Sequence, residues 1–174
     1  MRVAIHQPNY LPWLGLLHKI ASVDIFIIFD TASYSRGEFF NRNRIRVPVP
    51  SGYAWLTIPV PHNFKGTSLS KIPLSAFGSD WTQEHATAIQ THYSRSKYYQ
   101  EFSSRVLSLY ERVPGLEVLS DLSWESIEML FEPAGIKTKC VMASELTDNV
   151  PGDKTIRLLN LLEQVGATSY LSGS

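Results

Sequence analysis

The sequence feature that most constrains the fold lies near the start of the chain, where two short apolar runs flank an amphipathic segment. Residues 3–5 form the first run, which ends at His6, and residues 24–29 form the second, which ends at Asp30. Between them, residues 12–22 place apolar side chains at the spacing of one helix face. This order is typical of a strand, a crossover helix and a parallel strand. We therefore expect an α/β fold built on a three-layer, Rossmann-like, mostly parallel sheet.

His6 and Asp30 are the candidate catalytic residues, because they stand where the two predicted strands end. Open parallel sheets bind ligands in the crevice outside the carboxyl ends of their strands. Histidine titrates near neutral pH, so His6 would be the acid or base, and Asp30 would orient it or a substrate hydroxyl. A buried carboxylate also needs a partner, for which Arg42 or Arg44 is the candidate.

The loop after His6 supplies the first candidate binding residues. Gln7, Asn9 and Tyr10 offer amide and phenol groups suited to hydroxyl-rich or nucleotide ligands. His18, near the polar edge of the predicted helix, could serve as well as a structural residue. Two further candidates are Tyr34 and Ser172.

A basic segment at residues 41–44 is the second concentration of polar chemistry. In an extended chain Arg42 and Arg44 would share one face, and Asn41 and Asn43 the other. Arginine pairs bind phosphate or carboxylate groups bidentately. The segment therefore predicts that the small-molecule substrate is anionic, and that these four side chains contact it.

The rest of the sequence predicts a single domain over residues 1–174 with a helical insertion at about residues 80–134. We expect helices at residues 80–93, from 99 to just before 114, and from about 123 to 134, with a crossover helix at 153–165. We expect strands at residues 53–60, 72–74, 136–143 and 170–172. The last strand would deliver Ser172 and Gly173 to the crevice that holds His6.

Composition excludes several classes of protein. The net charge is zero and only 18% of residues are charged, which argues against bulk nucleic-acid binding. The single cysteine, Cys140, excludes an internal disulfide, and no metal-ligand spacing is found, since His85 and His92 are better explained as surface or boundary residues. No signal peptide or membrane segment is recognised, so a cytoplasmic protein without membrane insertion is expected. Trp55, Trp81 and Trp124 are most simply core residues.

Several segments together closely resemble the WbqC-like family of bacterial proteins. They cover residues 6–20, 29–30, 34–35, 41–45, 55–60, 144–146 and 170–173, with Trp81, His85 and Tyr93 in the same order. Members of that family are usually described as transferases and are often encoded among genes for surface polysaccharide and other sugar- or amine-modifying pathways. They usually continue some fifty residues beyond the motif at 170–173. The resemblance therefore implies that a C-terminal segment is absent here, and we expect either self-association as a homo-oligomer or weaker activity than longer relatives.

The leading functional hypothesis is acyl or aminoacyl transfer to a small polar substrate linked to a sugar or nucleotide. An alternative is nucleotidyl transfer or adenylation, in which the crevice takes ATP and a magnesium ion through Asp30. A third is a non-catalytic binding or scaffold protein. The cofactor is left open, and no bound metal is predicted.

Overall fold

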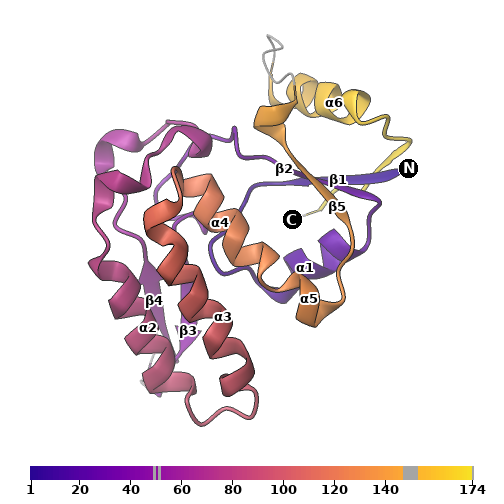
Figure 1. Ribbon diagram of the computed structural model, residues 1–174. Coiled ribbons are helices and arrows are strands. Elements are labelled where there is room, and N and C mark those ends of the chain that lie inside the picture. The colour runs from indigo at the N-terminus through magenta and orange to yellow at the C-terminus, as the bar shows by residue number, and fades with distance from the viewer. Residues whose placement is uncertain (49, 51, 147–152, 174) are drawn as a thin grey trace.

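The computed structural model contains a parallel sheet of four strands, in the order β5-β2-β1-β6 (Figure 1). The strands are β1 (Arg2–His6), β2 (Ile25–Ile28), β5 (Lys139–Met142) and β6 (Ser169–Tyr170). The structure describes residues 1–48, 50, 52–146 and 153–173. The predicted strand–helix–parallel strand unit is confirmed: β1 and β2 pair in parallel and are joined through α1 (Leu14–Ala21).

Helices cover both faces of this sheet, so the predicted three-layer α/β fold is confirmed. Successive strand side chains point to opposite faces. On one face, Ala4 and Phe26 pack with Ile20 of α1. On the other, Val3 and Ile5 share a buried cluster with helix α6 (Lys154–Gln164), which lies across the sheet in Figure 1.

An antiparallel hairpin lies beside the sheet. It joins β3 (Arg42–Arg46) to β4 (Tyr53–Thr57), and it pairs Arg44 with Trp55. Ile45 and Leu56 are buried beneath it, whereas the arginines of β3 point away from the core. Arg42 and Arg44 therefore share one face, as the alternation predicts.

The helical insertion contains α2 (Asp80–Tyr93), α3 (Tyr99–Arg112), α4 (Leu119–Glu128) and the short α5 (Phe131–Ala134). The predicted start of the third helix near Ser123 is wrong by one turn. Asp121 accepts a hydrogen bond from the Val118 backbone N–H at 3.3 Å and so caps an earlier helix start.

The predicted strand at residues 72–74 is also wrong. The chain there runs between two 3₁₀ turns, η2 (Leu69–Lys71) and η3 (Leu74–Phe77). Only an isolated bridge joins Pro73 to Val118. Pairing ends there because the Ile72 N–H, which would extend the ladder, donates to the Leu69 carbonyl oxygen of η2, and η3 begins at Leu74.

A buried hydrogen-bond chain joins the insertion to the loop after β1. The Tyr10 hydroxyl lies 2.7 Å from the Tyr110 hydroxyl and 2.9 Å from His85 Nδ1. Burial lowers the pKa of His85, and a contact with the Thr57 backbone of β4 raises it in part. The expectation of a surface or boundary position for His85 is therefore wrong, since only 3% of this residue is exposed.

No helix in the described ranges combines the length and apolarity needed to cross a membrane. Within the same ranges, histidine, cysteine and carboxylate side chains do not gather in groups of three or more that could hold a metal ion.

Candidate functional site

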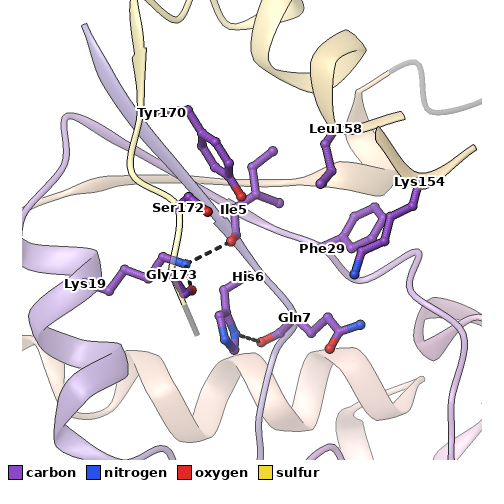
Figure 2. A pocket seen from close by; sticks show the side chains of 10 residues that line it. All are labelled: Ile5, His6, Gln7, Lys19, Phe29, Lys154, Leu158, Tyr170, Ser172 and Gly173. Carbon is purple, nitrogen blue, oxygen red and sulfur yellow. Dashed lines mark hydrogen bonds between the residues drawn. The ribbon is translucent and has the colours of Figure 1, made fainter. Parts of the chain in front are cut away.

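Two neighbouring cavities lie at the carboxyl end of β1, and His6 lines both. Lys19, Ser172 and Gly173 are also shared between them. The first, here named the Lys154 cavity, has a volume of about 270 Å³; its other lining residues are Ile5, Gln7, Phe29, Lys154, Leu158 and Tyr170 (Figure 2). The second, named the Trp13 cavity, has a volume of about 370 Å³; its other lining residues are Arg2, Trp13, Gly15, Leu16, His18, Ser22 and Leu171. The His6 side chain therefore lines both the Lys154 cavity and the Trp13 cavity.

The chemistry of His6 is determined by the residue that follows it. Its Nδ1 lies 2.8 Å from the Gln7 backbone carbonyl oxygen (Figure 2). A carbonyl oxygen only accepts, so Nδ1 carries a proton, and in the neutral ring Nε2 holds an available lone pair. Burial lowers the pKa of His6 below its ordinary value; the hydrogen bond to Gln7 raises it in part, and the charge of Lys19 lowers it further. At neutral pH this arrangement favours the neutral imidazole, which can act as a base.

Two lysines give the Lys154 cavity a positive character. Lys19 Nζ donates to the backbone carbonyl oxygens of Ile5 at 3.3 Å and Gly173 at 3.0 Å. Burial lowers the pKa of Lys19 from its ordinary value. Lys154 begins α6, and its ammonium group extends beside Phe29 toward Gln7 in Figure 2. The cavity therefore suits a small anionic group.

The final strand reaches this site where the sequence analysis expects it. β6 pairs in parallel with β1, and the Leu171 N–H donates to the Val3 carbonyl oxygen at 2.8 Å. Ser172 and Gly173 continue from that strand into both cavities. Lys19 also links this segment to β1, because its Nζ donates to the carbonyl oxygens of both Gly173 and Ile5.

Asp30 lies elsewhere and lines neither cavity. It is only 2% exposed, and its Oδ1 accepts a hydrogen bond from the Ser144 backbone N–H at 3.0 Å. Burial raises the pKa of the Asp30 carboxyl, partly offset by the bonds to Ser144. Asp30 does not pair with Arg42 or Arg44 as expected; instead it accepts a hydrogen bond from a backbone N–H of the 3₁₀ turn η5 (Ala143–Glu145) that follows β5. Gln7, rather than Asp30, orients His6.

The arginines of the basic segment lie on the hairpin, outside the two cavities. Arg42 stacks over the Trp55 ring, with its guanidinium carbon 4.0 Å from the ring centroid. Arg44 lies 5.1 Å from the ring centroid of Tyr53 and 5.5 Å from that of Trp55. The assignment of Trp55 to the core is wrong, because 38% of this residue is exposed.

The other predicted binding residues fall into two groups. Gln7 and His18 line the cavities. The remaining ones are buried or tied to the backbone: Asn9, Tyr10, Tyr34, Asn41 and Asn43. Asn41 donates to the Ile58 carbonyl oxygen at 2.7 Å, and Asn43 donates to the carbonyl oxygens of Tyr10 and Leu11. These contacts hold the hairpin against the loop after β1.

Sequence reasoning did not single out Lys19, Lys154 or Trp13 as site residues. Lys154 follows Asp153, whose side chain caps α6 by accepting from the Thr155 and Ile156 N–H groups. A basic residue at the start of a predicted crossover helix was the available signal. No pattern in the sequence indicated Lys19, because its role depends on a contact with Gly173 at the opposite end of the chain.

Comparisons with known proteins agree with the sequence resemblance. The model of the WbqC-like protein family matches residues 7–174, nearly the whole chain. The chain belongs to the WbqC-like protein family. This WbqC-like protein is also 35% identical over 173 residues to "Uncharacterized protein Rv1507c" of Mycobacterium tuberculosis, an alignment that covers 99% of this chain and 72% of that relative. No solved structure matches the chain.

Proposed function

We propose that this protein is a group-transfer enzyme that acylates or aminoacylates a small anionic substrate. His6 is the general base, and Lys19 and Lys154 stabilise the negative charge of the bound substrate. A sugar- or nucleotide-linked acceptor in polysaccharide or related biosynthesis is the substrate class that best fits the family resemblance.

The proposed step is nucleophilic substitution at an activated acyl carbon, such as that of a thioester. Nε2 of His6 takes the proton from a hydroxyl or amine of the acceptor as its oxygen or nitrogen bonds to the acyl carbon. The bond from that carbon to the donor sulfur breaks, and the sulfur leaves as a thiolate. The imidazolium then returns its proton to the thiolate, which regenerates neutral His6 and releases a thiol.

One observation carries this proposal: His6 lies on the boundary between two cavities that share it. A transferase must bring donor and acceptor into contact beside the group that moves the proton, and the two cavities that adjoin His6 offer one space for each. The hydrogen bond from Nδ1 to Gln7 supports the role of base, because it leaves Nε2 to accept the proton.

Adenylation with magnesium held by Asp30 has less support. That carboxylate is buried, bonded to Ser144, and absent from the lining of both cavities. A scaffold function would not explain the lowered pKa of His6 or the positive charge of the Lys154 cavity.

The test is a product screen by mass spectrometry. The protein is incubated with nucleotide-linked amino sugars and either thioester or aminoacyl donors or ATP with magnesium, and new masses equal to acceptor plus acyl or adenylyl group are sought. We expect such a product from the unmodified protein and a 10²- to 10⁴-fold lower rate from His6→Gln, roughly the contribution of a general base. His92→Gln, which changes an exposed histidine of α2, is the matched control. A product that forms equally fast with His6→Gln would overturn the role of His6, and an adenylated product formed only with ATP and magnesium would favour the alternative.

A further inference from the structure

The outer face of the β3–β4 hairpin carries an exposed set of cations and aromatic rings. Arg42, Arg44 and Arg46 alternate along β3 and pair with Thr57, Trp55 and Tyr53 of β4, respectively. Trp55 and Tyr53 are 38% and 40% exposed. Large aromatic rings that stay exposed next to arginines are typical of binding surfaces.

The arginines are held in position by these rings. Arg42 is stacked over Trp55 and also donates through Nη2 to the Gly37 backbone carbonyl oxygen. Its Nε is buried and has no hydrogen-bond partner among the residues that the structure describes. Arg44 is exposed, and no carboxylate among the described residues forms an ion pair with it. This side chain therefore retains its N–H donors for a ligand.

A row of ring contacts continues from the hairpin to the candidate site. Trp55 lies 5.9 Å from Phe39, Phe39 lies 6.5 Å from Trp13, and Trp13 lies 5.5 Å from His6, measured between ring centroids. Trp13 lines the Trp13 cavity and is 42% exposed. The hairpin face and His6 therefore lie on one continuous surface. The part of this surface that leads to His6 is here named the arginine–aromatic strip and consists of Trp13, Phe39, Arg42, Arg44, Tyr53 and Trp55.

We infer that the arginine–aromatic strip binds the nucleoside diphosphate portion of the substrate, so that the group attached to the diphosphate reaches His6. This inference rests on the proposed function and names its substrate class. A nucleobase stacks on exposed aromatic rings without needing specific hydrogen bonds. Guanidinium groups bind phosphate oxygens through paired N–H donors, which suits Arg44 beside the stacking rings.

The dimensions and charge of the strip favour a single nucleotide over a nucleic-acid strand. Its hairpin face is built from strands of five residues, and the chain has no net positive charge. The strip also leads to a cavity of about 370 Å³, within the range typical of small-ligand sites. A strand-binding groove would need further basic and aromatic positions.

The test is titration calorimetry with UDP and ADP as probes, with uridine and inorganic diphosphate as partial ligands. We expect both nucleoside diphosphates to bind, and each partial ligand to bind more weakly than UDP. Trp55→Ala and Arg44→Gln should each weaken UDP binding by about tenfold or more. Tyr98→Ala is the matched control, because that ring is 58% exposed and also carries a stacked cation, Lys97, at 5.0 Å. It should leave UDP affinity unchanged.

Three results would overturn the inference. The first is that neither nucleoside diphosphate binds. The second is that both strip variants bind UDP as tightly as the unmodified protein. The third is that an oligothymidine binds more tightly than UDP and that its binding also depends on Trp55. Because Arg44→Gln alters only an exposed side chain, its result stands even if Trp55→Ala disturbs the hairpin. The role of His6 is tested separately by comparing transfer rates of His6→Gln and His92→Gln, so a failure of the strip is distinguishable from a failure of the proposed function.

Discussion

Nδ1 of His6 lies 2.8 Å from the backbone carbonyl oxygen of Gln7, the next residue in the chain. In many enzymes a carboxylate from elsewhere in the fold orients the catalytic histidine. Here the main chain supplies the acceptor where β1 ends, and α1 supplies Lys19 nearby. The site therefore depends on the backbone geometry of the loop after β1.

Lys19→Met should raise the pKa of His6. The ammonium charge of Lys19 disfavours the imidazolium form, so removing that charge makes the ring easier to protonate. The measurement is an NMR pH titration of the His6 imidazole. Lys154→Met is the matched control, since this lysine lines the same cavity but is not among the causes of the lowered pKa. A His6 pKa that falls or stays constant in Lys19→Met would contradict the prediction.

Lys154→Met should weaken the binding of inorganic phosphate by roughly three- to fivefold, the effect of losing one exposed charge contact of up to about 1 kcal/mol. The affinity is measured by calorimetry at low salt, where such contacts are least screened. Lys137→Met removes an exposed lysine before β5 and should leave phosphate affinity unchanged. Equal losses in the two variants would mean that phosphate responds to net charge alone and not to the Lys154 cavity.

His85 should make the fold sensitive to acid. Burial lowers the pKa of His85 to about 4, against 6.5 for an ordinary histidine, so the unfolded chain binds a proton more readily than the folded one. The free energy of unfolding should therefore fall as pH drops from about 6.5 toward 4, by up to about 3 kcal/mol from this residue. Urea titrations across that range measure the loss. In His85→Gln the free energy of unfolding should depend less steeply on pH, whatever its absolute value. An unchanged dependence on pH would contradict the lowered pKa of His85 as the cause.

Tyr10→Phe should lower the free energy of unfolding by about 1–3 kcal/mol, because it leaves His85 Nδ1 without its hydrogen-bond partner in a buried position. Denaturant unfolding gives the value. Tyr98→Phe removes a hydroxyl from an exposed ring and should change stability little. If both variants unfold at the same urea concentration, the hydrogen-bond chain through Tyr10 does not hold the insertion to the loop.

The periodicity of the first thirty residues was sufficient to predict the strand–helix–strand unit. The pattern of a crossover helix before β6 was sufficient to predict that Ser172 reaches the site. Both follow from local patterns. The position and hydrogen-bond partner of the Asp30 side chain could not be predicted in this way. β2 ends at Ile28, the chain turns so that the Asp30 N–H donates to the Ile28 carbonyl oxygen, and the carboxylate meets Ser144 from a distant loop.

The exposed position of Trp55 could have been found from alternation alone. Tyr53, Trp55 and Thr57 share one face of β4 and Leu56 points to the other, so only one of the two faces can be core. The burial of His85 had no such local signal. It depends on Tyr10 and Tyr110, which lie 75 and 25 residues away in sequence and meet it only in the folded chain.

The most direct test of the central claim, that His6 presents an unprotonated Nε2 to the cavities at neutral pH, is ¹⁵N NMR of the histidine side chains. Assignment of His6 uses the His6→Gln spectrum. We predict a neutral ring at pH 7 with the proton on Nδ1, and a pKa below the ordinary histidine value. A ring that is charged at pH 7, or neutral with its proton on Nε2, would contradict the account, because His6 could not then accept a proton from a substrate in either cavity.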